Sequence, residues 1–460
     1  MPHLTRRPLE WACDATALFA PLQHLPWAML LDSATDVATP HPDARFDIIV
    51  ADPVVTLTTR GQQTQIQGPD LEQTSDEDPL TLLEQQLSAH LPHIDEHQDL
   101  PFCGGALGHF SYDLGRRFER LPANAQDDIQ LAEMAVGLYD WALVLCHERD
   151  QVELVVLGDE QAWQSRLQWL VDQCSQTLVD FSLTGPWHHD TSHGNYLKAF
   201  DQVQEYLKSG DCYQINLTQR FHAPYEGSEW QAYQILRRHN LAPFSAFIRL
   251  PDAALLSVSP ERFLLVEGDQ VQTKPIKGTR PRKSDPGLDN QSALELAHSE
   301  KDRAENLMIV DLLRNDIGRV SAPGSVQVPS LFAIESFPAV HHLVSTVTST
   351  LATGVTPCDL LRGAFPGGSI TGAPKIRAME IIEELEPWRR SLYCGSIGYI
   401  SCHGRMDTSI TIRSLVAKSG QIYCWAGGGI VADSHGEAEY QECFDKLARI
   451  LPVLSQASHT

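Results

Sequence analysis

The sequence predicts an α+β fold built on antiparallel sheets. Runs rich in β-branched and large apolar residues recur along the chain with few helical segments between them, which favours antiparallel sheets over a doubly wound parallel sheet. A chain of 460 residues with 42% hydrophobic content is long enough to bury a large core. No internal repeat at a solenoid period is visible.

The first elements follow from local patterns. Residues 45–59 and 151–159 are enriched in β-branched residues and are predicted strands. Residues 196–210 have the spacing of an amphipathic helix that ends on a glycine. Residues 244–250 and 254–268 are again predicted strands.

Three later elements carry more polar groups. Residues 420–433 predict a strand, a glycine turn and a strand; the glycines favour a tight hairpin and a close approach of backbone to a ligand about equally. Residues 434–451 predict a helix in which Ser434 and Glu437 form a capping box. Residues 299–319 predict a helix with one wide buried face, formed by Leu307, Met308, Val310, Leu312 and Leu313.

Two segments look like breaks in the chain. Residues 67–79 are acidic and strand-poor, and residues 182–195 are rich in Gly, Pro, His and Asp. The second segment is the better boundary. We therefore expect an amino-terminal region, 1–182, and a catalytic region, 190–452, intertwined as one compact unit.

The composition limits the function classes. The formal net charge of −24 argues against a nucleic-acid partner, because neutralising phosphates needs an extended cationic surface. The ten cysteines form neither a zinc-type cluster nor a disulfide framework, which is typical of a reducing compartment. The sequence has no signal-peptide pattern and no window of about 18 apolar residues. We expect a cytoplasmic protein with no membrane partner.

A glycine-rich segment at 365–380 does not complete a phosphate-binding loop. Gly367 and Gly372 have the required spacing, but Ala373 and Pro374 precede Lys375, and no hydroxyl residue follows that lysine. A nucleotide-hydrolysing function is therefore disfavoured. Free backbone N–H groups and nearby hydroxyls at the start of a helix would suit a carboxylate instead.

Two groups of charges allow an ordinary interpretation as well as a functional one. Residues 272–283, "QTKPIKGTRPRK", contain five cations, and charge runs of this kind usually face water. Glu439, Glu442 and Lys446 follow one another at spacings of three and four, as in an exposed ion-pair stripe.

A set of motifs between residues 196 and 451 resembles the chorismate-utilising enzymes, the family that includes anthranilate synthase component I and the isochorismate and salicylate synthases. The first 180 residues resemble the amino-terminal part of the amine-forming members. The resemblance implies an anthranilate-synthase-type fold, with two large, mostly antiparallel sheets packed face to face and helices outside. The motifs are "SPERF" (259–263), "PIKGTRPR" (275–282), "DRAENLMIVDLLRND" (302–316), "HHLVS" (341–345), "FPGGSITGAPK" (365–375), "GSIGY" (395–399), "MDTSITIR" (406–413), "AGGGIVADS" (426–434) and "EAEYQECFDK" (437–446).

Two positions separate the chemistries of this family. Members that aminate C4 of chorismate typically carry lysine inside the "PI-x-GT" motif, and this chain has Lys277; anthranilate synthases carry a small residue there. Members that add water place a lysine base where this chain has Gln214. The resemblance therefore implies a transferase that makes 4-amino-4-deoxychorismate for 4-aminobenzoate and folate, with anthranilate synthase component I as the alternative.

The resemblance also assigns catalytic roles. Glu261 would protonate the leaving C4 hydroxyl, Lys277 would attack C2 to give a covalent intermediate, and His342 would lie near the hydroxyl, with Gln214 in the same catalytic set. Deprotonating a lysine at pH 7 costs about 4–5 kcal/mol from a pKa near 10.4. We expect the neighbouring cations, among them Lys274, to help by lowering that pKa. Only the resemblance selects Lys277 over Lys274.

The same resemblance implies a magnesium ion held by Glu305 and Glu442, with Asp302 and Glu439 holding its waters. The carboxylates of chorismate need cationic, hydroxyl and backbone N–H partners. The matching positions are Ser369, Tyr393, Arg413, Gly427, Gly428, Gly429 and Lys446.

Two further partners are implied. The family has an amino-terminal tryptophan pocket, and its counterpart here would be formed by Ser33, Asp43, Ala44, Arg45, Phe46, Pro243, Phe244 and Ser245. Asp43 departs from the aromatic residue expected there. The sequence has no Cys-His glutaminase signature, so we expect ammonia from a separate glutamine amidotransferase subunit or from solution.

Overall fold

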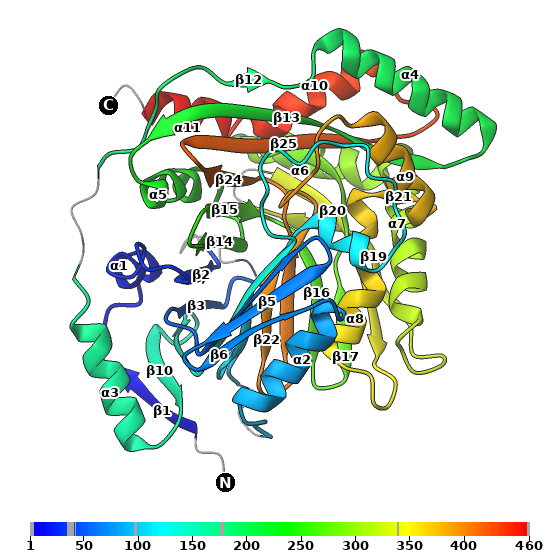
Figure 1. The fold of residues 1–460 in the computed structure, drawn as a ribbon. Helices are drawn as coiled ribbons and strands as arrows, with labels where there is room; N and C mark the ends of the chain where they lie inside the picture. The colour runs from blue at the N-terminus through cyan, green and yellow to red at the C-terminus, as the bar shows by residue number, and fades with distance from the viewer. Residues whose placement is uncertain are drawn as a thin grey trace.

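The computed structural model describes residues 4–34, 41, 43–95, 99–174, 179–337 and 340–457. Their strands form two large sheets in which neighbouring strands run antiparallel. The helices lie on the outside of this pair of sheets (Figure 1). The predicted α+β class with two antiparallel sheets is confirmed.

The first sheet has 13 strands among the described residues. Its order is β1 (Leu4–Leu9), β10 (Gln151–Leu157), β9 (Trp141–Cys146), β3 (Phe46–Val50), β2 (Met29–Asp32), β14 (Phe244–Arg249), β15 (Ala254–Ser259), β24 (Ser414–Lys418), β25 (Gln421–Ile430), β13 (Gln214–Glu226) and β11 (Ser182–Leu183), with β12 (His188–His189) and β21 (Gly372–Ala373) also paired to β13.

The second sheet has 12 strands in the same part of the chain. Its order is β18 (Ile276–Pro281), β20 (Val340–Thr350), β17 (Gln270–Thr273), β16 (Arg262–Glu267), β23 (Met406–Ile410), β22 (Ser396–Ser401), β7 (Gly105–Phe110), β8 (Met134–Tyr139), β4 (Val55–Arg60), β5 (Gln63–Gly68) and β6 (Leu71–Ser75), with β19 (Gln327–Ser336) paired to β20.

Helices cover the outer faces and ends of the sheets. In Figure 1, α10 and α4 lie along the long strands β13 and β25 at the top of the molecule. The helices are α1 (Ala15–Phe19), α2 (Pro79–His90), α3 (Glu160–Val171), α4 (His193–Ser209), α5 (Glu229–Asn240), α6 (Pro286–His298), α7 (Glu300–Gly318), α8 (Pro357–Ala364), α9 (Lys375–Leu385), α10 (Gly436–Leu447) and α11 (Leu451–Ala457), with 3-10 turns η1 (Tyr112–Arg117) and η2 (Gly368–Ile370). No helix in the described ranges is both long and apolar enough to cross a membrane.

The first sheet is buried on both faces. On β2, Met29 belongs to the core between the two sheets, while its neighbour Leu30 belongs to the core between this sheet and the helices. Ile48 and Ile49 on β3 divide between the two cores in the same way. Because side chains alternate between faces, a strand buried on both sides reads as one continuous apolar run.

Two runs that were each predicted as a single strand are divided in the structure, and the two halves of each run belong to different sheets. The run 45–59 divides into β3 and β4 around Asp52, whose φ of 53° turns the chain. The run 254–268 divides into β15 and β16, so the chain passes from the first sheet to the second at Pro260 and Glu261. A single-strand interpretation was wrong at both places, because both halves of each run are apolar.

Three local predictions were also wrong. The segment 67–79 is not strand-poor, because it contains the end of β5 and all of β6. Ser434 makes no capping box: His435 is the N-cap of α10, and the Ser434 hydroxyl donates to Glu439 Oε1 at 2.7 Å. The glycines at 427–429 form no turn and lie inside the continuous strand β25.

The predicted helices are present, but the buried face of one of them differs from the prediction. Helix α4 ends on Gly210 in the left-handed conformation, as predicted. On α7 the buried face is rotated from the predicted one, because Leu307 is 46% exposed and Leu312 is half-buried. That face is formed by Asn306, Ile309, Val310, Leu313, Asp316 and Ile317. The division into regions 1–182 and 190–452 stays a prediction.

Candidate active site

A cavity of about 760 Å³ collects most of the predicted site residues. Its walls come from both sheets and from α7 and α10. Two of the predicted residues, Gln214 and Gly428, do not line it. The predicted residues that do are Glu261, Lys277, His342, Ser369, Tyr393, Arg413, Gly427, Gly429, Lys446, Asp302, Glu305, Glu439 and Glu442.

Two passages of the chain between the sheets position the acid and a guanidinium. Glu261 lies between β15 and β16, and Arg413 lies between β23 and β24. The passages are side by side, because Ile410 N–H donates to the Glu261 carbonyl at 3.0 Å and Val258 N–H donates to the Arg413 carbonyl at 3.1 Å. Both side chains therefore enter the cavity from a rigid junction.

Ser369 connects Glu261 and Lys277. The Lys277 ammonium donates to the Ser369 carbonyl at 2.9 Å, and the Ser369 hydroxyl donates to Glu261 Oε1 at 2.8 Å. Burial raises the pKa of Glu261 to about 7, against the opposing effects of Ser369 and Lys277. Burial also lowers the pKa of Lys277. A carboxyl that keeps its proton near neutrality thus lies beside an amine that loses one more easily than usual.

The cations near Lys277 do not act as expected, because carboxylates already pair with three of them. Lys274 pairs with Glu335 at 2.8 Å, Arg280 with Asp302 at 2.9 Å, and Arg282 with Asp289 at 2.8 Å. The pKa of Lys277 is lowered by its burial first and by Lys446 among the cations. The expectation that neighbouring residues of the basic run lower it is therefore wrong.

His342 lies on β20 with its ring in the cavity wall. Its Nδ1 and the hydroxyl of Thr279 are 2.8 Å apart, and its Nε2 is buried without a hydrogen-bond partner in the described part of the chain. Burial lowers the pKa of His342 to about 3, so the imidazole is neutral. It can therefore orient a hydroxyl without competing for protons with Glu261.

Four carboxylates from α7 and α10 line one part of the cavity. Burial raises the pKa of Glu305 and of Glu439. Burial acts in the same direction on Glu442, but the Lys446 ammonium at 2.7 Å outweighs it and lowers that pKa. The raised pKa values of Glu305 and Glu439 show that burial makes their ionised forms costly, and a bound cation would offset this cost.

The three glycines of β25 make room for polar side chains on both faces of the sheet. A Cβ at Gly429 would lie 2.1 Å from Gln214 Nε2, and one at Gly428 would lie 2.9 Å from Glu439 Oε2. A Cβ at Gly427 would lie 2.5 Å from the Leu217 carbonyl. The glycines thus allow a close approach of the backbone to protein groups, and the approach to a ligand stays a prediction. Gln214 packs behind the cavity wall.

Arg413 is a half-buried cation. In the described ranges its guanidinium makes no hydrogen bond and no ion pair, and partial burial lowers its pKa. A partly buried charge of this kind is costly unless an anion binds to it.

The sequence prediction missed several polar residues of the cavity wall. A period-two pattern could have found two of them: Asn216 follows Gln214 by two residues on β13, and Trp425 precedes Gly427 by two on β25. The Trp425 ring stacks on Tyr393 with centroids 6.3 Å apart. The missed residues are Asn216, Thr279, Lys301, Trp425 and Arg449.

A second cavity, of about 310 Å³, lies at the predicted tryptophan pocket. Ala44 is the one predicted residue that does not line it. The Ser33 hydroxyl donates to Asp47 Oδ1 at 2.7 Å. The predicted residues that line this cavity are Ser33, Asp43, Arg45, Phe46, Pro243, Phe244 and Ser245.

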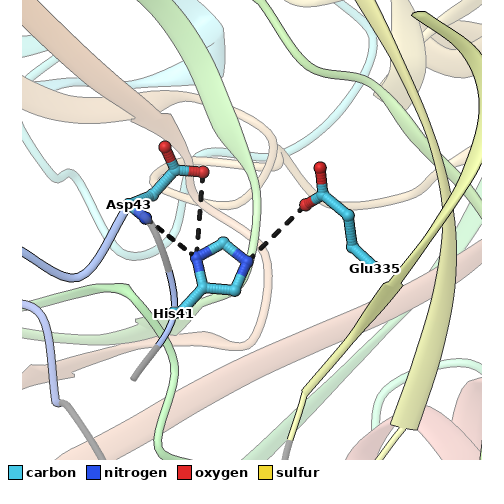
Figure 2. A group of neighbouring side chains, drawn as sticks. All are labelled: His41, Asp43 and Glu335. Atoms are coloured by element: carbon cyan, nitrogen blue, oxygen red, sulfur yellow. Dashed lines mark hydrogen bonds and ion pairs between the residues drawn. The ribbon is translucent and has the colours of Figure 1, made fainter. Parts of the chain in front are cut away.

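Asp43 also belongs to a group of titratable side chains with His41 and Glu335 (Figure 2). The three could together hold a metal ion. The Lys274 ammonium, however, lies 3.1 Å from Asp43 Oδ2 and 2.8 Å from Glu335 Oε1. A lysine thus already supplies the cation for these carboxylates.

The fold and the site define a chorismate-utilising enzyme. A family model described as chorismate binding enzyme matches residues 34–452, and the chain belongs to this family.

Individual relatives indicate a particular member of this family. The chain is 59% identical over 447 residues to aminodeoxychorismate synthase component 1 of Salmonella typhimurium, covering 97% of each chain. It is 58% identical over 449 residues to the protein of that name in Escherichia coli K12, covering 97% of this chain and 98% of the relative. The solved structure of anthranilate synthase component I from Streptococcus pneumoniae matches with a TM-score of 0.79 at 32% identity, covering 90% of this chain and 93% of the other.

Proposed function

We propose that this chain converts chorismate and ammonia into 4-amino-4-deoxychorismate, the activity implied by the name aminodeoxychorismate synthase component 1 of its relatives. The product would serve 4-aminobenzoate and folate synthesis. The observation that carries the proposal is the chain of contacts from Lys277 through Ser369 to Glu261. Anthranilate synthases have no need of a lysine nucleophile at this place, so the alternative is less supported.

The proposed reaction begins with Glu261 in its protonated form, which its pKa of about 7 provides near neutral pH. Glu261 gives its proton to the C4 hydroxyl, which leaves as water, while the neutral Lys277 amine forms a bond to C2 and the ring double bonds shift. Glu261, now ionised, can take back the proton that the new C–N bond releases from Lys277.

In the second half, ammonia forms a bond to C4 and the Lys277 amine leaves C2. Glu261 returns the proton to the departing amine and then takes one from the ammonium group formed at C4, which leaves a neutral product amine and a protonated Glu261 as at the start. Two allylic displacements thus place nitrogen on the carbon that lost oxygen. Without Lys277, C2 would be open to ammonia itself, which is the anthranilate regiochemistry.

The charged groups of the cavity suit a dianionic substrate. Arg413, a half-buried cation with no ion pair among the described residues, would take one carboxylate. Lys446 and Tyr393, together with the N–H groups of Gly427 and Gly429, would contact the rest of the anion. Tyr393 and Gly427 are buried and Arg413 is half-buried, which strengthens their attraction for a negative ligand.

Magnesium would bind Glu305 and Glu442, with Asp302 and Glu439 holding its waters. The donor set fits, because this metal prefers one or two carboxylates and keeps several waters. When bound, the ion would polarise a substrate oxygen. Lys301 is 3.8 Å from Glu439, so the carboxylates are partly compensated even by the chain itself.

Ammonia would come from a glutamine amidotransferase subunit. The name "component 1" of the relatives supports a partner component. No cysteine lines the cavity within the described residues, so the site offers no thiol for glutamine hydrolysis.

Tryptophan binding in the second cavity is also proposed. Its support is the cavity's position at seven of the eight predicted residues. Thermal unfolding with and without L-tryptophan tests this: no upward shift at saturating tryptophan would count against it.

The decisive experiment for the main proposal is a turnover and mass assay. With chorismate, magnesium and ammonia, the protein alone should form 4-amino-4-deoxychorismate and no fluorescent anthranilate. With ammonia left out, intact mass followed by peptide mapping should find an adduct on Lys277. Lys277→Ala should abolish the adduct and Lys274→Ala should keep it; anthranilate as the main product of the unmodified chain would sink the proposal.

A further inference from the structure

Asp43 carries two buried ion pairs with one carboxylate. Its Oδ1 accepts from Arg262 Nη1 at 2.6 Å, and its Oδ2 accepts from Lys274 Nζ at 3.1 Å. All three side chains are at least 85% buried. Burial alone would raise the pKa of Asp43, but Arg262 and Lys274 outweigh it and lower that pKa, so the carboxylate is ionised.

Each partner of Asp43 is close in sequence to a proposed catalytic residue. Arg262 directly follows Glu261 at the start of β16. Lys274 lies between β17 and β18 and precedes Lys277 by three residues. Strands β16 and β17 form a hairpin, yet β18 pairs with β20 and not with either of them. The backbone ladders therefore do not pair the Glu261 junction with the start of β18, where the Ile276 N–H donates to the Glu261 carboxylate instead.

We propose that Asp43 is a positioning residue, which holds Glu261 and Lys277 in register by joining Arg262 to Lys274. The inference rests on the proposed function. The amino-terminal segment thus adds a link between the two strand starts that carry Glu261 and Lys277, and this link is made of charge and not of backbone pairing.

The rest of the network fixes this link. Arg262 also holds Asp407 with two bonds of 3.0 Å, which ties its guanidinium to β23. Glu335 holds Lys274 from the opposite side, and its position in the group is seen in Figure 2. Arg262 and Lys274 thus each retain one carboxylate when Asp43 is neutralised, so the fold can survive the change while the link is lost.

The geometry makes Asp43 and Glu335 a matched pair for testing. Both carboxylates pair with Lys274, but only Asp43 also reaches Arg262. Asp43→Asn should lower kcat about tenfold to a hundredfold, the cost of misplacing reacting groups by about 1 Å. The KM for chorismate should stay within about threefold, since Arg413 and Lys446 are untouched. Glu335→Gln should change kcat by less than about threefold.

A double-mutant cycle distinguishes a structural link through Asp43 from a role in which Asp43 only neutralises the charge of Lys274. If Asp43 and Lys274 form one link, then Asp43→Asn, Lys274→Met and the double variant should lose similar factors of kcat and of the rate of Lys277 adduct formation. Recovery of wild-type kcat in the double variant would overturn the inference, because it would mean that Asp43 only neutralises Lys274. Equal losses in Asp43→Asn and Glu335→Gln would overturn it as well.

If the proposed function itself were wrong, the results would differ from those that refute only the positioning role of Asp43. In that case the unmodified protein would form neither the adduct nor the product, whatever the variants do. An active unmodified protein whose Asp43→Asn variant keeps full kcat would refute the positioning role alone.

Discussion

Replacing Glu261 by glutamine should abolish turnover and yet stabilise the folded protein, increasingly so as the pH rises. The Glu261 side chain is 4% exposed, and burial raises its pKa from 4.5 to about 7. Between these two values the unfolded chain has lost the proton while the folded chain keeps it, so the free energy of unfolding falls as the pH rises. Above pH 7 Glu261 lowers the free energy of unfolding by the full amount, about 3 kcal/mol, because each pKa unit between the folded and unfolded states is worth about 1.4 kcal/mol.

The size of this effect can be converted into a melting temperature. At about 2.1 cal/mol/K per residue, a chain of 460 residues has an unfolding entropy of about 1 kcal/mol/K, so 3 kcal/mol corresponds to about 3 °C. Glutamine keeps the shape of the carboxyl and still accepts from the Ser369 hydroxyl. Glu261→Gln should therefore melt about 1 °C above the unmodified protein at pH 5 and about 3 °C above it at pH 8.

Differential scanning fluorimetry of both proteins from pH 5 to pH 8 measures the gap directly. The matched control is Glu10→Gln, a change at an exposed carboxylate, which should show no pH-dependent gap. A gap that stays constant across this range would refute the reasoning, because it would mean that Glu261 ionises in the folded protein as it does in the unfolded one.

Three further outcomes are expected. First, kcat should fall as the pH rises through about 7, since Glu261 then loses the proton it must donate; a pH–rate profile that is still rising at pH 8 would contradict this. Second, Arg413→Met should weaken chorismate binding at least about 100-fold in calorimetry and should not lower the melting temperature, since it removes a half-buried charge that has no ion pair among the described residues. Unchanged affinity would show that Arg413 does not contact the substrate. Third, Gly427→Ala should destabilise the fold by about 1–3 kcal/mol, because its Cβ would lie 2.5 Å from the Leu217 carbonyl. The control Gly194→Ala should be neutral, because its Cβ would meet nothing within 4 Å. Equal melting temperatures for the two variants would argue against the crowding of β25.

The local chemistry of the site was predictable from the sequence to a large degree. The motifs identified Glu261, Lys277, Arg413 and the helix carboxylates, and the structure brings them to one cavity. Their catalytic roles stay proposals. The strands were found as apolar runs, but the passage between sheets at Glu261 was not, although Pro260 marks it: proline lacks the N–H that a continuing strand would need.

Long-range pairing could not be predicted in the same way. The glycines of β25 were predicted to form a turn, because no local signal says that Gln214, Leu217 and Glu439 crowd against the strand. The partner of Lys274 is 231 residues away at Asp43, so its ion pair is invisible in the basic run itself. Of the five cations that the sequence presents as a patch, three form separate ion pairs in the fold, and Lys277 donates to a carbonyl instead.

These pairings distinguish the two lysines that the sequence alone could not. Lys274 is bound by Asp43 and Glu335, and such partners keep an ammonium charged. Lys277 donates to a neutral carbonyl and is half-buried, which lowers its pKa and favours the uncharged amine that the proposed nucleophile must be. The groups that oppose this are Glu305, Glu261 and Glu442, all of which raise the pKa of Lys277. Glu305 and Glu442 are also the proposed metal ligands, and Glu261 is protonated when the reaction begins. In the proposed reaction, a cation bound to the first two and a proton on the third would leave little to hold the charge on Lys277, so the amine would become reactive when the site is loaded.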